Sequence, residues 1–210
     1  MFILYKVGDE MVEDWQSFLA PYRQAVEELK VKFKGIRNEF EEANLQSPIE
    51  FVTGRVKRPE SILRKAKFRE VVEMNEQNIE DVIEDIGGIR IMCQFVEDIY
   101  RVVEILHNRE DFDIIVERDY ITHKKASGYR SYHIVIAYPI ERITGTDSIL
   151  VEIQIRTLAM NFWATIEHSL NYKYAGDYPM ELHKRLERAA EAAFQLDEEM
   201  SAIREEIKDA

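Results

Sequence analysis

Two acidic residues occupy positions where they could hold a metal ion. Asp85 precedes two glycines and a predicted strand at 89–95. Glu152 lies in a second predicted strand, 149–155, whose strict alternation places Glu152 and Gln154 on one face. Because Mg²⁺ prefers few carboxylates together with substrate phosphates, these two acids are candidates for a Mg²⁺ site. The alternative for each is a solvated acid, beside a helix end or on the exposed face of an antiparallel strand.

A cationic segment lies just before the first of these acids. Residues 50–69 carry seven bases and two acids, a local charge of +5. Arg55 and Lys57 lie two apart and would share one face of a strand, and Ser61 and Lys65 lie four apart near a helix start. Two cations, a hydroxyl group and a helix N-terminus suit a polyphosphate, and a solvated helix face is the alternative. The chain has no GxxxxGK[ST] motif, which excludes a P-loop.

Two further segments carry residue types that bind nucleobases and phosphates. A basic, glycine-containing loop around Lys125 leads into a predicted strand that presents Tyr129 and His133 on one face. A tyrosine ring can stack on a base, and basic side chains can bind phosphate. Farther along, Asn161 and His168 are spaced to share a helix face, where they could bind the edge of a base. An exposed loop and a hydrogen-bonded core histidine are the alternatives.

These residues require a sheet and surrounding helices to bring them together. We predict a single domain over 1–210, with an N-terminal helical part at 11–44, a sheet region at 49–157 and C-terminal helices at 158–210. Strands are expected at 49–55, 89–95, 112–116, 130–138 and 149–155, and helices at 60–73 and 97–107. The pattern predicts an α+β fold, a mixed and mostly antiparallel sheet of about five strands flanked by helices. The apolar stripe of the first zone either packs on the domain's own core or is shared with another subunit.

The composition limits the class of protein and its compartment. The 210 residues carry 28 bases and 40 acids, and the net charge of −12 argues against a protein that coats duplex nucleic acid. Cys93 is the single cysteine, which excludes an internal disulfide framework and fits a reducing compartment. The sequence shows no targeting signal at its start and no apolar run near the ~18 residues that span a bilayer. We therefore expect a cytoplasmic protein that does not contact a membrane.

Seven segments together resemble the synthetase domain of the RelA/SpoT family, and in particular its stand-alone small alarmone synthetases. The matching segments are SPIEFVTGRVK (47–57), SILRKA (61–66), EDIGGIRIMCQF (84–95), RDYI (118–121), SGYRSYH (127–133), VEIQIRTLAMNFWATIEHSLNYKY (151–174) and LDEEM (196–200). The resemblance implies a nucleotidyltransferase-like synthetase domain and a Mg²⁺-dependent pyrophosphokinase of the stringent response. Such an enzyme moves the β,γ-pyrophosphate of ATP to the 3′-hydroxyl of GDP or GTP, giving ppGpp or pppGpp and AMP.

The resemblance also implies roles for individual residues. Asp85 and Glu152 would be catalytic and would hold Mg²⁺, with Glu152 activating the 3′-hydroxyl group. The residues implied in ATP binding are Arg55, Lys57, Ser61, Lys65, Arg90 and His133. The residues implied in binding GDP or GTP are Lys125, Tyr129, Gln154, Asn161 and His168. Arg55 and Arg90 would sandwich the adenine, and Tyr129 would stack on the guanine.

The same resemblance implies how the subunits of this protein assemble and how its activity is regulated. Small alarmone synthetases are similar in forming homotetramers, and in one subgroup alarmone also binds a central allosteric cleft. The matching allosteric positions here are Lys30, Lys34, Arg37, Glu50, Phe51 and Thr53. None of the five histidines is followed by aspartate, so the sequence lacks the His-Asp pair of alarmone hydrolases and we expect no hydrolase activity. The segment 67–80 departs from the family pattern and carries extra residues.

A binding module is the main competing hypothesis. It would be a catalytically silent relative that senses guanine nucleotides or single-stranded RNA through its basic cleft. The presence of Asp85, Glu152 and Tyr129 together argues against it, because a pure binder does not need the acid pair. Single-stranded RNA is also considered as a regulator of the enzyme. A different nucleotidyl- or phosphotransferase on a related fold is the third hypothesis, and the reaction products distinguish it.

Overall fold

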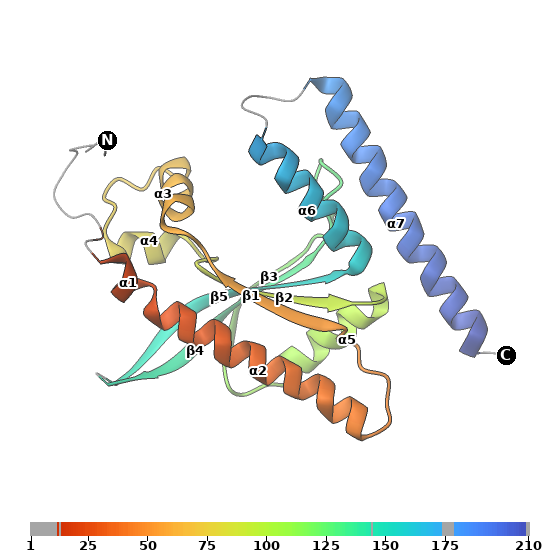
Figure 1. Cartoon of the computed structure of the whole chain (residues 1–210), viewed down its shortest axis with the longest axis horizontal. Helices are drawn as coiled ribbons and strands as arrows, with labels where there is room; N and C mark the ends of the chain where they lie inside the picture. The colour runs from red at the N-terminus through yellow and green to blue at the C-terminus, as the bar shows by residue number, and fades with distance from the viewer. Residues whose placement is uncertain (1–11, 13, 144, 174–178, 209–210) are drawn as a thin grey trace.

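The structure is a computed structural model that describes residues 12, 14–143, 145–173 and 179–208. The described residues form one five-stranded sheet with helices packed around it (Figure 1). The outer limits of the two predicted helical parts, at residue 11 and at 209–210, lie outside the described residues.

The sheet is mixed, as the sequence predicts. Its strands are β1 (Phe51–Val56), β2 (Gly87–Cys93), β3 (Asp113–Asp119), β4 (Tyr132–Arg142) and β5 (Gly145–Thr157). Their order across the sheet is β1-β2-β5-β4-β3. The β2 and β5 strands pair in parallel, while the other neighbours pair antiparallel. The central parallel pair therefore sets the strand that follows Asp85 beside the strand that carries Glu152.

One face of the sheet is covered by α2 (Ala20–Glu42) and α5 (Val96–His107) (Figure 1). The apolar stripe predicted in the first zone lies on α2, where Leu29 and Phe33 have no exposed surface. Both residues belong to one core cluster with sheet residues such as Ile153. The stripe is therefore part of the domain's own core and is covered before any second subunit could reach it.

The first zone is divided into two helices by its local sequence. The short α1 (Trp15–Phe18) is capped by Asp14, whose side chain accepts the backbone N–H groups of Gln16 and Ser17 at 2.9 and 3.1 Å. Pro21 lies in the first turn of α2, where its missing N–H leaves no intrahelical bond unmade. The change of direction between α1 and α2 therefore falls where proline is tolerated.

Two short helices lead to Asp85, and the first of them carries part of the cationic segment. The first, α3 (Pro59–Phe68), begins with proline, and α4 (Glu76–Val82) is capped by the Asn75 side chain. The prediction of a helix over 60–73 is wrong at its C-terminal end. Glu70 has a left-handed backbone with φ 58°, which terminates the helix and turns the chain toward α4.

The C-terminal zone forms α6 (Leu158–Lys173) and α7 (Met180–Lys208), which pack against each other. The indole N–H of Trp163 on α6 donates to the carbonyl of Leu186 on α7 at 3.0 Å. From α6, α7 runs past one end of the sheet toward α5 (Figure 1). Among the described residues, no helix combines the length and the apolar character needed to cross a membrane.

Candidate active site

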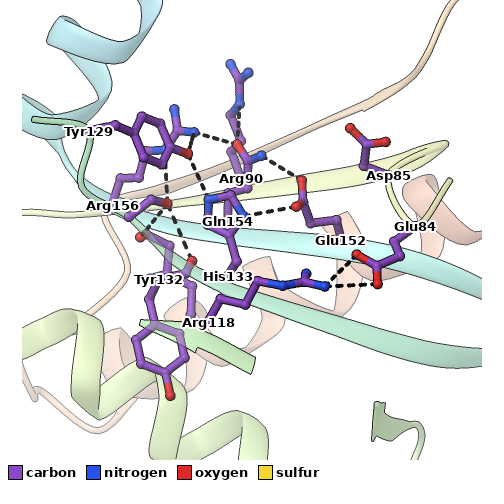
Figure 2. A network of polar contacts seen from close by, with 12 residues as sticks. Glu84, Asp85, Arg90, Arg118, Tyr129, Tyr132, His133, Glu152, Gln154 and Arg156 are labelled. Atoms are coloured by element: carbon purple, nitrogen blue, oxygen red, sulfur yellow. Dashed lines mark hydrogen bonds and ion pairs between the residues drawn. The ribbon is translucent and has the colours of Figure 1, made fainter. Parts of the chain in front are cut away.

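Polar side chains line the sheet face opposite α2 and α5 (Figure 2). In the strand register, Glu152 lies beside Gly88, and Gln154 lies between Arg90 and His133. Successive residues of a strand point to opposite faces, so these side chains project together while the intervening isoleucines enter the core. The alternation in the sequence thus predicted correctly that Glu152 and Gln154 share a face.

Asp85 binds two lysine side chains at the edge of this face. Lys65 Nζ lies 2.7 Å from Asp85 Oδ1, and Lys57 Nζ contacts the other carboxylate oxygen. Burial alone would raise the pKa of Asp85, but the two ammonium groups outweigh it and hold the pKa below its ordinary value. Burial also lowers the pKa of Lys57, against the opposing effect of its ion pair. Asp85 is therefore an ionised carboxylate at neutral pH, with two cations gathered around it.

Hydrogen bonds fix both carboxylate oxygens of Glu152. His133 Nδ1 lies 2.9 Å from Oε1, and the side-chain amide of Gln154 donates to Oε2 at 2.7 Å. Only 13% of the Glu152 side chain is exposed. Burial would raise the pKa of Glu152, and so does the charge of neighbouring Asp85, but the contacts with His133 and Gln154 lower it overall. Glu152 is thus a second ionised carboxylate with a fixed orientation.

Two neighbouring cavities open along these acids. The smaller, of about 190 Å³, is lined by both carboxylates and by Arg55, Arg90 and Gln154. The larger, of about 1020 Å³, runs along α3 and is lined by residues that include Arg55, Lys57, Ser61 and Lys65. Arg55 lines both, so the two cavities are adjacent. Five of the six residues predicted to bind ATP, all except His133, therefore line adjoining cavities beside the acid pair.

Tyr129 lies on the other side of Glu152 from Asp85 (Figure 2). It belongs to an aromatic and cationic cluster, in which Lys125 Nζ lies 5.0 Å from the centre of its ring. The Tyr129 hydroxyl lies 2.7 Å from His133 Nε2 and accepts a hydrogen bond from Arg156 at 2.6 Å. The Tyr120 ring meets the rings of Tyr129 and His133 edge-on. Lys125 Nζ lies 4.4 Å from the centre of the Tyr120 ring. His133 contacts both the Tyr129 hydroxyl and the Glu152 carboxylate in this structure, and its binding of phosphate stays a prediction.

The two α6 residues predicted to bind guanine have different surroundings in the structure. His168 lines the larger cavity with Lys57 and Lys65. Asn161 has a buried Oδ1 atom without a hydrogen-bond partner among the described residues. Seven residues of helix span about 10 Å, so a shared helix face does not mean a shared binding pocket.

The predicted allosteric residues lie on α2 and at the edge strand β1. Arg37 connects these elements, because its guanidinium donates to the backbone carbonyl of Glu50 at 2.5 Å. The Glu50 carboxylate in turn accepts the Gln94 amide at 2.7 Å. Lys30 pairs with Glu27, and the three remaining residues of this group are exposed, namely Lys34, Phe51 and Thr53. Arg37 and Glu50 are therefore in contact, whereas Thr53 lines the smaller cavity with Arg55 and Arg90.

Three further residues of this polar face have no role predicted from the sequence. Arg118 on β3 pairs with Glu84 at 2.9 Å, and Arg156 donates to Gln154 Oε1 at 2.7 Å (Figure 2). Tyr120 completes the aromatic cluster. A signal was present, because the alternation of β5 continues to Arg156 and the RDYI segment places Arg118 and Tyr120 two residues apart.

Known proteins share this arrangement of sequence and fold. Residues 54–177 match the family model described as a region found in RelA/SpoT proteins. The chain is 59% identical to the GTP pyrophosphokinase YjbM of Bacillus subtilis, over 94% of this chain and 92% of the relative. Its structure resembles that of small alarmone synthetase 1 from Bacillus subtilis bound to its product pppGpp, with a TM-score of 0.86 and 60% identity over 92% of this chain and 97% of that chain. A structure of that synthetase bound to AMPCPP matches with a TM-score of 0.80 and 55% identity, covering 93% of this chain and 98% of that chain. The chain therefore belongs to the RelA/SpoT family.

Proposed function

We propose that this chain is a GTP pyrophosphokinase that transfers the β,γ-pyrophosphate of ATP to the 3′-hydroxyl group of GDP or GTP. The products are ppGpp or pppGpp and AMP. One observation carries the proposal: the cationic wall of Arg55, Lys57 and Lys65 opens directly beside the carboxylates of Asp85 and Glu152. A polyphosphate on that wall would present its phosphorus atoms to the acid pair. The name of YjbM and the nucleotides in the related structures support the same reaction.

The donor ATP occupies the two adjoining cavities in this proposal. Lys57, Ser61 and Lys65 bind its phosphates, and Arg55 and Arg90 hold the adenine between them. Burial and neighbouring guanidinium groups lower the pKa of Arg90, which reflects a local excess of positive charge. Such an excess favours an anionic ligand.

The acceptor GDP or GTP binds on the other side of Glu152. Tyr129 provides the ring that stacks on guanine, and Lys125 beside it pairs with the acceptor phosphates. The Asn161 oxygen is a buried acceptor atom without a partner among the described residues, so it is a candidate for a base amino group. Gln154 contributes indirectly, since it holds the carboxylate of Glu152.

The acid pair fits a Mg²⁺ ion whose remaining ligands come from substrate. Among the described residues, no three His, Cys, Asp or Glu side chains cluster as a complete metal site. Mg²⁺ does not need such a cluster, because it is commonly bound by one or two carboxylates and by substrate phosphates. Asp85 and Glu152 are both ionised and line one cavity, so they would hold the ion. When bound, Mg²⁺ neutralises charge on the transferred phosphates.

Glu152 acts as the general base for the acceptor hydroxyl. The 3′-oxygen forms a bond to the β-phosphorus of ATP, the bond from that phosphorus to the α,β-bridging oxygen breaks, and AMP leaves. The proton of the hydroxyl group passes to Glu152. His133 and Gln154 fix the direction of the carboxylate, which is the positioning that phosphoryl-type transfer requires.

A Glu152→Gln substitution tests this assignment. Glutamine keeps the size of the side chain but cannot take the proton, so kcat should fall by about 10²- to 10⁴-fold. The dissociation constants of ATP and GDP should remain near those of the wild type, as measured by calorimetry with each nucleotide alone. Glu104→Gln, an exposed acid on α5, is the control and should keep full activity. Wild-type turnover in the Glu152→Gln protein would remove Glu152 from the mechanism.

We further propose that the chain works in the cytoplasm as a homotetramer with two regulators. Its single cysteine, Cys93, is buried and free, which suits a reducing compartment. An alarmone effector would bind at the α2–β1 surface around Lys34, Arg37 and Thr53. Single-stranded RNA would regulate through the cationic cavity that ATP also uses.

A further inference from the structure

The loop that carries Lys125 and Tyr129 rests directly on α7. We define residues 124–130 as the acceptor loop. Gly128 within it has φ +85°, and a Cβ atom placed on Gly128 would lie 2.5 Å from the Cβ atom of Ala190 on α7. The Gly128 N–H also donates to the Lys125 carbonyl at 2.8 Å and closes a turn. Both the left-handed backbone of Gly128 and its close approach to Ala190 require glycine, so the loop packs against the helix at a defined position.

One residue of α7 binds both ends of the acceptor loop. Glu191 Oε2 lies 3.1 Å from Lys124 Nζ and 3.1 Å from the Arg130 guanidinium. The Arg130 side chain is only 6% exposed, and its guanidinium lies 3.9 Å from the centre of the Phe194 ring. A buried guanidinium requires a counter-charge, so its contact with Glu191 matters more than an ion pair in open solvent.

The helix that carries Glu191 is itself fixed on either side of that residue. Before it, the Leu186 carbonyl accepts the Trp163 indole N–H. After it, the Asp197 carboxylate accepts the Thr157 hydroxyl at 2.7 Å at the end of β5. Glu191 is therefore held in register with the sheet and with α6, and it can act as a fixed anchor for the loop.

We propose that Glu191 is a positioning residue that holds the acceptor loop so that Lys125 and Tyr129 face the acceptor nucleotide. The nature of that nucleotide, GDP or GTP, rests on the proposed function. Lys124 directly precedes Lys125, and Arg130 directly follows Tyr129, so releasing either end displaces its binding neighbour. Glu191 acts through the loop and touches no reacting atom.

Steady-state kinetics separate this role from a general structural one. In a Glu191→Gln variant, the KM for GDP or GTP should rise about fivefold. This is the upper end of the effect expected when a partly exposed ion pair is lost. The KM for ATP should not change, because Arg55, Lys57, Ser61, Lys65 and Arg90 lie on β1, α3 and β2. The Tm should fall slightly, because the buried Arg130 loses its counter-charge. Lys124→Met, which removes one of the two cations, should shift the acceptor KM in the same direction by less. Glu198→Gln, an exposed acid on α7, is the matched control and should match the wild type.

Limited trypsin digestion reports on the same loop without any reaction. Cleavage after Lys124 and Lys125 should be faster in Glu191→Gln than in the wild type or in Glu198→Gln. Unchanged cleavage together with an unchanged acceptor KM would overturn the proposal. An equal rise of both KM values would also overturn it, since it indicates a purely structural role. If the wild type makes no alarmone, the proposed function fails, and the digestion alone then decides the role of Glu191.

Discussion

Asp85 gathers two lysine side chains at the place where we propose that polyphosphate binds. Lys57 and Lys65 are both paired with it, so Asp85 balances part of the positive charge of the cavity wall. Phosphate oxygens can replace the carboxylate as partners of the lysines. The carboxylate is then free to bind Mg²⁺. Asp85 would thereby link the binding of the nucleotide to the binding of the metal.

An Asp85→Asn substitution should uncouple these two events. Turnover should fall by roughly 10²-fold or more, because a carboxylate at the metal is lost. Binding of ATP in the presence of EDTA should be retained or become tighter, because Lys57 and Lys65 lose their internal counter-charge. Calorimetry and initial rates measure the two effects. Asp81→Asn on α4 is the control, and loss of metal-free ATP binding in Asp85→Asn would contradict this account.

The sequence predicted much of the site from residue spacing alone. The two-residue alternation in β5 placed Glu152 with Gln154, and the spacing of Arg55, Lys57, Ser61 and Lys65 predicted the cationic wall that these residues form. The assignment of that wall to ATP came from the family resemblance. The contact between Arg118 and Glu84 could not be predicted in this way, because it depends on where β3 lies in the strand order.

Helix α2 packs so closely on β1 that only glycine fits at one position. A Cβ atom on Gly54 would lie 2.6 Å from Val26 Cγ1 and 3.0 Å from Ile89 Cδ1. Gly54→Ala should therefore lower the free energy of unfolding by about 1 to 3 kcal/mol through overpacking. Gly35→Ala in the same helix is the contrasting control, because a Cβ atom there meets nothing within 4 Å. It should stabilise by about 0.5 to 1 kcal/mol.

Urea unfolding of both variants measures this contrast. Equal stability of Gly54→Ala and the wild type would mean that α2 and β1 are farther apart than described. A destabilised Gly35→Ala protein would mean that the exposed side of α2 is in contact with something else.

The anchor between α7 and β5 should make stability depend on pH. Burial raises the pKa of Asp197 from 3.8 to about 6, despite the Thr157 hydrogen bond and nearby Arg130, with Glu97 adding to the rise. Between these pH values the folded state keeps a proton that the unfolded state has lost. The free energy of unfolding therefore falls as pH rises from about 4 to about 6, by up to about 3 kcal/mol from this group.

An Asp197→Asn variant removes that titration while keeping an oxygen for the Thr157 hydroxyl. Relative to the wild type, it should gain roughly 1 to 3 kcal/mol of stability between pH 4.5 and pH 7.5. Urea melts of both proteins at each pH give the difference, in which the other titrating groups cancel. Asp113→Asn, an exposed residue of β3, should show no such trend. A difference that does not vary with pH would refute the assignment.

The sequence predicted which helices and strands form more accurately than it predicted the residues at which they end. Periodicity predicted the sheet and the long helices, because buried faces repeat regularly. The end of α3 depended on the backbone conformation of Glu70, which side-chain pattern does not report. The first apolar stripe left two possibilities open, and only the packing of α2 on the sheet decides that Leu29 and Phe33 belong to the core.

The distribution of exposed apolar surface shifts the expected subunit contact from α2 to α6. Phe162, Ile166 and Leu170 on α6 lie four residues apart and are 70%, 46% and 44% exposed. Large apolar side chains on one helix face favour association. Light scattering should give a mass of about four times 24.8 kDa. Phe162→Glu should lower that mass, whereas Ile143→Glu at the hairpin tip should not, and a monomeric wild type would contradict the tetramer.

The products formed by the purified protein test the proposed pyrophosphate transfer most directly. The purified protein should be incubated with ATP, Mg²⁺ and either GDP or GTP, and the nucleotides resolved by anion-exchange chromatography. The account predicts a new guanine nucleotide with two additional phosphates, formed together with an equimolar amount of AMP. The absence of a new nucleotide while ATP and GDP still bind would contradict it and favour a nucleotide sensor. Release of free pyrophosphate in place of AMP would contradict it as well, because that product identifies adenylyl transfer.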